Sequence, residues 1–491
     1  MTTTCSDTRG VRLRLSLFHV RRGTLVKRAI LVVACVFAPL CLRPAHASVP
    51  VLGRAQRQAI ASSTPVVGPL RTVRVGQHPA LVAIDARDHR VFVANEGPLS
   101  FDYALPTRPG SVTTLDERTG VVLRTVRVGQ SPVSLAFDAP TGRVFVLCAG
   151  RVNSAGYSEG GSSVSVLDAV TGALLRTLPV GLTPLTVSAS GASPGSRQAL
   201  AVDATSGRVY VAVPAAVLVL DGTTGVVRRT ITLRGGVQPG APVPSVIAVS
   251  GQARRLYVGD SGDTGLPFVP SSTVSGLFGV VDATTGKGLD NVALTQSGVS
   301  VIAVDERASR VLVFELHGNR EYSTVVDVLD APSGKLLHTT NLGVPSDGGI
   351  AVGVDRSTSR TFVLYAPSAY EFQNSLDKMV VILDTHSGKL LQTVALPTPM
   401  HQGFLRGPVV AVDQRDGRVL VAAAQGLFTD EAGQTITASS VYVLDARSGK
   451  VLHSLKVGLG PQDVAVDEVA RRVFVTNEHD NTLSVFDARR L

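Results

Sequence analysis

The sequence contains no tryptophan, and aromatic residues make up only 5% of its 491 residues. Charged residues are also sparse, at 17%. Hydrophobic residues nevertheless reach 44%, which is enough to build a large core in a chain of this length. This composition excludes an intrinsically disordered chain.

Common catalytic signatures are missing as well. The chain has no Cys-x-x-Cys-His sequence, which excludes covalent attachment of a c-type haem. It also has no His-Glu-x-x-His sequence, which excludes the common helical zinc protease site. No cofactor is therefore evident from motifs.

Most of the excess positive charge lies at the N-terminus. The formal net charge is +9, but residues 1–47 hold eight basic residues and one acidic residue, Asp7. The remainder has 39 basic and 37 acidic residues, a net charge of +2. We therefore expect no nucleic-acid partner for this part of the chain.

The N-terminal segment has the pattern of a secretion signal. Lys27 and Arg28 precede an apolar run from Ala29 to Leu42, and Ala45-His46-Ala47 stands directly before Ser48. The apolar run covers about 21 Å as a helix, which is short of a bilayer core of about 30 Å. The pattern predicts a signal peptide over residues 1–47, a secreted or periplasmic protein, and no transmembrane anchor after cleavage.

Two other leader types match less well. Arg21-Arg22 resembles a twin-arginine signal, but Thr24 stands where that signal has an apolar residue. Cys35 follows a Val-Ala pair as in lipid attachment, but the apolar run before it is short. The long basic segment favours a translation start near Leu25 or Val26.

Only one cysteine, Cys148, lies outside this leader. A single cysteine cannot form an internal disulfide, so the fold must depend on its core. We expect Cys148 to be a partly buried thiol at the end of a strand.

The remaining chain is built from an internal repeat of about 55 residues. One half of the repeat has a short apolar run ending in Asp or Ser, four intervening residues, and then Arg before a second apolar run. The eight copies are Asp85/Arg90, Asp138/Arg143, Asp203/Arg208, Ser250/Arg255, Asp305/Arg310, Asp355/Arg360, Asp413/Arg418 and Asp467/Arg472.

The other half of the repeat is a third apolar run ending in Asp-x-x-Thr-Gly or Asp-x-x-Ser-Gly. Seven copies are complete, and an eighth stops at Asp487. This motif is typical of a tight hairpin, because Asp can accept backbone hydrogen bonds and Gly adopts positive φ. The Asp and Arg of the first half could pair across their own hairpin.

Four short strands in each repeat predict an all-β protein, a β-propeller of four-stranded blades. Eight copies favour eight blades, with seven as the alternative. Runs such as Val91-Phe92-Val93 are apolar on both faces of a strand, as expected when each blade is packed between two others. His338 and His453 fall on outermost strands, where we expect exposure.

The ends of the repeat array indicate how the ring closes. Residues 70–77 are identical to residues 123–130, which form the outermost strand of the first blade. The eighth copy lacks such a strand. We therefore expect the N-terminal strand to complete blade eight, with residues 48–68 as a linker and residues 69–491 as the propeller.

Two parts of the repeat resemble a known family. Phe92-Val93-Ala94-Asn95 and Phe474-Val475-Thr476-Asn477, followed by residues 481–487, are similar to the YVTN-type repeat of exported bacterial YncE-like proteins. The resemblance extends over residues 69–491. It implies a periplasmic or surface propeller, although seven blades are usual in that family and only blades one and eight keep the Asn.

Loop lengths indicate one binding face. Both short hairpins are nearly constant, whereas the step from the second strand to the third varies between 6 and 20 positions. Connections between blades vary too. Since these two variable connections lie on the same side of a four-stranded blade, one rim of the ring is the expected binding face.

Polar side chains on that rim are the candidate ligand-binding residues. They are Asn95, Glu96, Asn477, Glu478, His479, His78, Asp463, Glu315, His317 and His401. Ring closure should bring the Asn-Glu pairs of blades one and eight together. Glu96, Asn477 and Glu478 are the candidate ligands for a possible divalent cation.

Three functions fit these features. The first is a non-enzymatic exported scaffold that binds a small ligand, a glycan or an envelope protein. The second is a metal-assisted hydrolase similar to lactonase propellers, with its site in the central funnel and a metal-bound water as nucleophile. The third is a propeller subunit of a redox system.

Cleavage of the leader should leave Ser48 as the first residue of the exported protein. N-terminal sequencing of protein recovered from outside the cytoplasm tests this, and any other mature end would contradict the predicted cleavage site.

Overall fold

The structure, a computed structural model, describes residues 64–98, 108–152, 158–181, 187–188, 191–192, 198–233, 244–260, 278–292, 298–316, 324–343, 349–366, 379–396, 409–422, 427–429, 435–437 and 440–491. These residues are almost all in strands and turns, with one helical turn, η4 (Ala488–Arg490), at the C-terminus. No helix in this described part has the length and hydropathy that a membrane-spanning segment needs.

The strands form eight four-stranded antiparallel blades. Blades one to four are β3 (Pro79–Asp85), β4 (Arg90–Asn95), β5 (Pro109–Asp116) and β6 (Val122–Gln130); β7 (Pro132–Asp138), β8 (Arg143–Cys148), β11 (Ser162–Asp168) and β12 (Leu174–Gly181); β15 (Leu200–Asp203), β16 (Arg208–Val213), β17 (Ala216–Asp221) and β18 (Val227–Thr232); and β19 (Pro244–Ser250), β20 (Arg255–Asp260), β21 (Phe278–Asp282) and β22 (Gly288–Val292).

The other four blades have the same order. They are β23 (Val299–Asp305), β24 (Arg310–Leu316), β25 (Thr324–Asp330) and β26 (Leu336–Asn341); β27 (Gly349–Asp355), β28 (Arg360–Ala366), β29 (Met379–Asp384) and β30 (Leu390–Ala395); β31 (Val409–Asp413), β32 (Arg418–Ala422), β35 (Ser440–Asp445) and β36 (Val451–Lys456); and β37 (Pro461–Asp467), β38 (Arg472–Asn477) and β39 (Thr482–Asp487) with β2 (Arg71–Arg74).

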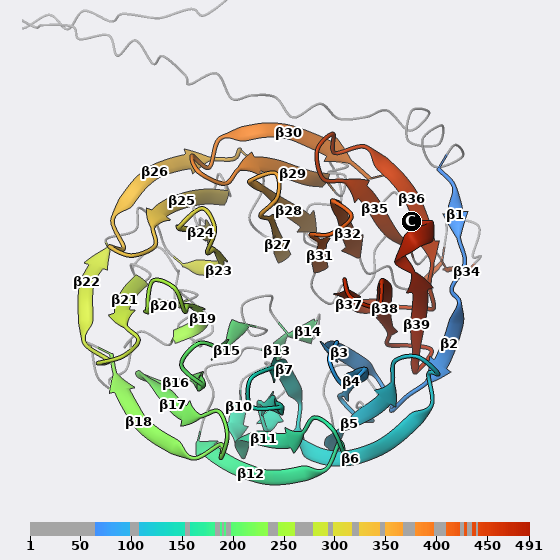
Figure 1. Cartoon of the computed structure of the whole chain (residues 1–491), viewed down its shortest axis with the longest axis horizontal. Coiled ribbons are helices and arrows are strands. Elements are labelled where there is room, and N and C mark those ends of the chain that lie inside the picture. The colour runs from blue at the N-terminus through green and yellow to red at the C-terminus, as the bar shows by residue number, and fades with distance from the viewer. Residues whose placement is uncertain are drawn as a thin grey trace, which may run out of the picture. The chain divides into compact units, whose positions relative to one another are not determined.

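The blades are arranged in a closed ring. The first strand of each blade lies next to the centre, and each of these strands contacts the first strand of the next blade, including β37 of blade eight with β3 of blade one (Figure 1). The predicted β-propeller with eight blades is therefore confirmed, and the alternative of seven is wrong.

The N-terminal strand closes the ring as predicted. β2 pairs antiparallel with β39, with Arg71 opposite Val485 and Arg74 opposite Thr482. Blade eight therefore combines three strands from the C-terminus with one from the N-terminus. We call the junction between blades eight and one the seam.

The core lies between the blades. In β4, Val91 and Val93 pack toward blade eight in a cluster with Phe474, whereas Phe92 on the other face packs toward blade two against Val144. All of these side chains are at most 1% exposed. Because both faces of each strand are buried, the strands have continuous apolar runs instead of alternating apolar and polar residues.

Blade seven has an additional outer strand. β1 (Val66–Val67), at the end of the segment expected to be a linker, pairs parallel with β36. Its register places Val66 opposite Ser454, next to His453. His453 is consequently half-buried and not exposed as expected, and this burial lowers the pKa of its imidazole. His338 is exposed, as expected.

The Asp-x-x-Thr-Gly hairpins have the predicted geometry. In blade one, the backbone N–H and the hydroxyl of Thr119 both donate to Asp116 Oδ1 at 2.8 Å, and Gly120 has φ 73°. The backbone hydrogen bond from Thr119 is the main cause that lowers the pKa of Asp116.

The recurrent Arg has a different partner from the one expected. Arg90 lies opposite Asp85 in register, but its guanidinium bonds Asp116 of the other hairpin at 3.3 Å. Asp85 instead accepts the backbone N–H groups of Arg87 and Asp88 within its own turn. The strand order explains the difference, because Arg90 also lies directly opposite Asp116. Its ion pair therefore joins the two hairpins of the blade.

Removal of residues 70–75 should lower the melting temperature by about 5 °C or more, because the blade-eight edge and the packing of Val73 and Val75 at the seam are lost. Thermal unfolding followed by circular dichroism tests this. The control variant Thr72→Ala/Arg74→Ala, which changes only exposed side chains, should melt like the unaltered protein. An unchanged transition in the deletion variant would contradict closure by β2.

Candidate functional site

The two edges of the ring differ in the way the repeat predicts. Asp85, Arg90 and Asp116 lie at one end of blade one, so both of its short hairpins are on the same edge. We call this the hairpin edge. The opposite edge, which we call the rim, carries the connections from the second strand to the third and from each blade to the next.

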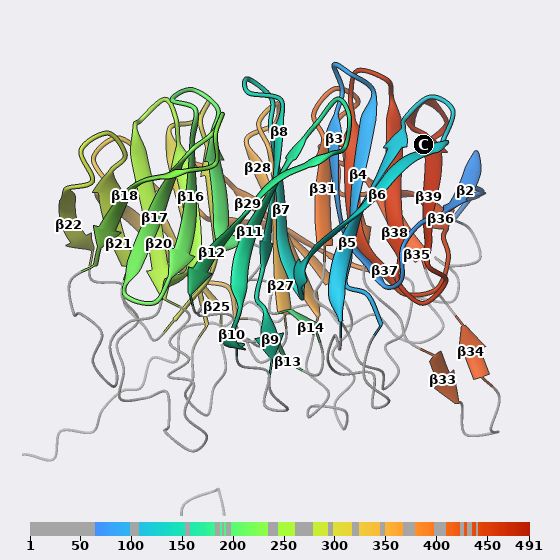
Figure 2. The ribbon, with the colours of Figure 1, turned by 90° about the horizontal axis from the view of Figure 1, so that it is seen from below.

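Three small hairpins extend the rim (Figure 2). They fall in variable connections of blades two, three and seven: β9 (Arg151–Val152) with β10 (Ser158–Gly160), β13 (Val187–Ser188) with β14 (Gly191–Ala192), and β33 (Leu427–Thr429) with β34 (Thr435–Thr437). The hairpin edge has no such additions among the described residues. The rim is therefore the edge on which the blades differ.

Asn95 and Asn477, two of the candidate ligand-binding residues, make hydrogen bonds within their own blades. Both side chains are fully buried. The Asn95 amide donates to Ser111 Oγ and Thr113 Oγ1 at 3.1 Å. The Asn477 amide donates to two hydroxyls of β39, and its oxygen accepts the N–H of Gly458 at 3.1 Å. Each Asn thus fastens its strand to the next strand of the blade.

Blades one and eight are each preceded by a glycine, Gly76 or Gly458, because a side chain there would collide with the Asn. A Cβ on Gly76 would lie 2.6 Å from the Asn95 side chain, and one on Gly458 would lie 2.8 Å from Asn477. In blade two Cys148 stands in place of the Asn, facing Gly129. Cys148 is fully buried and not partly buried as expected, because this position faces the neighbouring turn. Burial raises the pKa of its thiol to about 12, which makes it a poor nucleophile.

Two histidines and a glutamate meet on the rim at the seam. His78 lies between β2 and β3, and Glu478 and His479 follow β38. The potential ligand atoms of these three side chains all lie within 4.8 Å of one another. Glu478 is 2% exposed, His78 is half-buried and His479 is exposed, so the group opens to solvent on one side.

Hydrogen bonds hold this group, which we call the seam cluster (His78, Glu478 and His479). The amide of Gln462 in β37 donates to Glu478 Oε2 at 2.6 Å. Glu478 Oε1 then lies 3.5 Å from His78 Nδ1. The backbone N–H of His78 donates to the Asn481 side chain at 2.8 Å, across the seam.

Glu96 and Asp463 also lie at the seam. The backbone N–H of Glu96 donates to the carbonyl of His78 at 3.0 Å, and the Glu96 side chain is 8% exposed. Asp463 Oδ2 accepts the N–H of Val82 at 2.9 Å, which joins β37 to β3. Ring closure thus places five of the ten candidates at the seam, namely His78, Glu96, Asp463, Glu478 and His479.

Another candidate, Glu315, lies in a different blade. Glu315 is fully buried at the end of β24 in blade five, at the position that Asn95 occupies in blade one. His317 and His401 lie outside the described residues.

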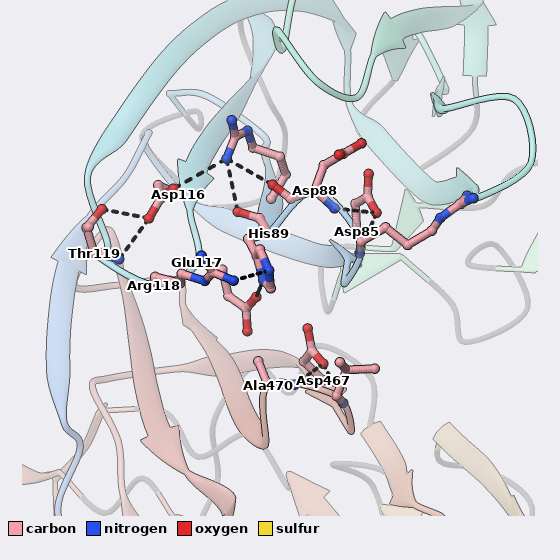
Figure 3. A network of polar contacts seen from close by, with 12 residues as sticks. Asp85, Asp88, His89, Asp116, Glu117, Arg118, Thr119, Asp467 and Ala470 are labelled. Carbon is pink, nitrogen blue, oxygen red and sulfur yellow. Dashed lines mark hydrogen bonds and ion pairs between the residues drawn. The ribbon is translucent and has the colours of Figure 1, made fainter.

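The sequence analysis missed a second polar pair at the seam, on the hairpin edge (Figure 3). His89 Nδ1 lies 3.0 Å from Glu117 Oε2, and the Glu117 side chain is 0% exposed. Asp467 of blade eight lies nearby and opposes ionisation of Glu117. Burial is the main cause that raises the pKa of Glu117, and the hydrogen bond from His89 offsets it only in part.

Comparison of the repeats could have found this pair. Glu117 follows the hairpin Asp at a position where the other seven blades have Ala, Gly or Thr: Ala169, Gly222, Ala283, Ala331, Thr385, Ala446 and Ala488. A carboxylate in place of a small, buried residue does not improve apolar packing, so Glu117 stands out among the repeats. The unusual residue could be seen in the sequence, but the burial of the Glu117 side chain could not.

Comparisons with known proteins agree with the fold. No protein-family model matches the chain, and a search of the curated proteins finds no match. Among solved structures, it is similar to the Dos1 propeller (12% identity, TM-score 0.60, covering 86% of this chain and 95% of that one) and to BamB from Moraxella catarrhalis (13%, 0.51, 85% and 98%). It is also similar to the computationally designed Ika8 protein (17%, 0.53, 84% and 98%). At these identities the similarity shows the fold alone, which is that of a β-propeller.

Replacing Glu117 by Gln should stabilise the protein at neutral pH. Because its pKa is raised in the folded state, ionised Glu117 costs stability as pH rises above its ordinary value of 4.5, and the cost levels off above the raised pKa. The variant should therefore melt higher at pH 7, on the order of 1 °C for each kcal/mol gained, and the difference should shrink toward pH 4.

Melting curves between pH 4 and pH 8 test this prediction. Asp88→Asn removes an exposed carboxylate from the neighbouring turn and should show no such pH-dependent gain. A Glu117→Gln variant that melts lower than the unaltered protein at pH 7 would show that the charged carboxylate is stabilising.

Proposed function

We propose that this protein is an exported, non-enzymatic scaffold that binds its partner through the rim. The observation that carries the proposal is the contrast between the two edges of the ring. Blade after blade repeats the same Asp- and Arg-based hairpins on one edge, whereas the connections differ on the other. Variation confined to one face of a repeat array is typical of a binding face.

The leader supports export. A basic segment, a short apolar run and a small-x-small site precede the propeller, and the nearly neutral remainder has no disulfide to lose in either redox environment. The YVTN-like sequences of blades one and eight support the same location. The partner proposed is a small ligand, a glycan or an envelope protein.

One observation favours the alternative of a metal-assisted hydrolase. The seam cluster has three side chains of the types that catalytic zinc sites use, and it opens to solvent. Hydrolysis would require a bound ion with a free coordination position. Glu96, Asn477 and Glu478 were the expected ligands of this ion, but the buried Asn477 side chain already makes hydrogen bonds with β39 and Gly458.

Site-specific photo-crosslinking in intact cells can test the rim. A photoreactive residue would replace one exposed side chain at a time on the rim, at Arg108, Arg151 or Asp480, or on the hairpin edge, at Val170 or Val469. The rim positions should give discrete adducts. The hairpin positions should not, because the turns there present nearly the same structure in every blade.

The valines are a demanding control, since Val170 and Val469 are 51% and 69% exposed and would report non-specific apolar contact. Adducts confined to the hairpin edge, or equal on both edges, would contradict binding through the rim.

A further inference from the structure

We propose that the seam cluster is a binding site for a divalent transition-metal ion of the Zn²⁺ class. The site consists of His78, Glu478 and His479. It does not depend on the function proposed above, since an ion here can stabilise the ring whatever the rim binds.

The donor set fits this class of ion. Two imidazoles and one carboxylate are typical ligands of Zn²⁺ and of neighbouring first-row ions, whereas Mg²⁺ and Ca²⁺ prefer oxygen. The three ligand atoms already lie within 4.8 Å of one another. In the rest of the described ranges, no other trio of histidine, cysteine or acidic side chains comes this close.

The carboxylate is held in place for this role. Glu478 is 2% exposed, and Gln462 donates to its Oε2 at 2.6 Å, so Oε1 is the oxygen directed at His78. His78 Nδ1 is buried and makes no hydrogen bond within the structure. A cation between this nitrogen and the carboxylate oxygen would bond to both atoms.

The backbone around the seam cluster has the same geometry in blades one, two and eight, but blade two lacks the metal-binding side chains. His78 has φ 51°, Ser131 in blade two has φ 55° and Gly460 in blade eight has φ 67°. The carbonyl of each accepts the N–H of a rim residue, Glu96, Ala149 or Glu478 respectively, at 2.8–3.0 Å. Blade two thus has the same frame with Ser131 and Ala149 in place of the donors.

The second imidazole, that of His479, occupies space that a glycine at position 460 leaves open. His479 lies over Gly460, where a Cβ would come within 2.8 Å of its Cδ2 atom. Histidine at the left-handed position of blade one and glycine at that of blade eight are therefore both needed to place two imidazoles beside Glu478.

An ion at this site would cross-link the two ends of the propeller. His78 follows the closing strand β2, and its neighbour across the seam, Asn481, is 403 positions away in the sequence. Cross-links that close long loops restrict the unfolded chain the most. Ion binding should therefore stabilise closure of the ring.

Isothermal titration of the purified protein with Zn²⁺, without a polyhistidine tag and after treatment with a chelator, tests the proposal. We expect one tight site per chain and a melting temperature higher by about 3 °C at roughly a hundredfold excess of ion over its Kd. His78→Ser, which copies blade two, and His479→Asn, which changes an exposed side chain, should each weaken binding by more than about a hundredfold. Gln462→Leu should weaken it by about 10- to 100-fold.

His89→Ser is the matched control. His89 has the same left-handed backbone, with φ 52°, and a buried glutamate beside it, but it lies on the hairpin edge. Its loss should leave Zn²⁺ affinity unchanged. The proposal is overturned if no saturable site is found, or if His479→Asn, in a protein that remains folded by circular dichroism, binds Zn²⁺ as tightly as the unaltered protein.

Discussion

The constraint on which this fold depends is the burial of both faces of every blade. A strand such as β4 has Val91 and Val93 on one face and Phe92 on the other, and each face needs an apolar neighbour. An open row of blades would leave two faces exposed at its ends, so the array must close into a ring. At the junction between the two ends of the array, β37 packs against β3 and the N-terminal strand β2 pairs with β39, which completes blade eight.

At the seam created by this closure, polar residues depart from the repeat on both edges of the ring. On the rim, His78, Glu478 and His479 replace residues that carry no metal-binding side chain in blade two. On the hairpin edge, Glu117 replaces a small residue and is buried beside His89. Seven junctions of the ring are made by blades that follow one another in sequence, whereas this one joins the two ends of the chain. The metal site proposed at the seam would therefore couple closure of the ring to ion binding, and the raised pKa of Glu117 couples the stability of the fold to protonation.

Much of the fold could be predicted because the repeat carries redundant information. Eight copies of the five-residue spacing from Asp, or once Ser, to Arg established the blades, and the duplicated stretch at residues 70–77 established the closing strand. The errors arose where side chains choose among several partners. Arg90 has Asp85 and Asp116 directly opposite it on two strands, and sequence spacing alone cannot decide between them. His453 was misjudged because two residues before the repeat add a strand beside it.

By itself, the sequence determined the all-β class, the number of blades, the closure and the edge on which the blades vary, because each follows from periodicity and loop length. Only the tertiary structure decided which rim residues are ligand candidates. Asn95 and Asn477 are adjacent in sequence to Glu96 and Glu478, yet the amides are buried under the turn before each blade while Glu478 faces His78. Which side of a strand end a polar side chain occupies depends on the blade packed against it, and residues about 400 positions apart meet only after the ring has closed.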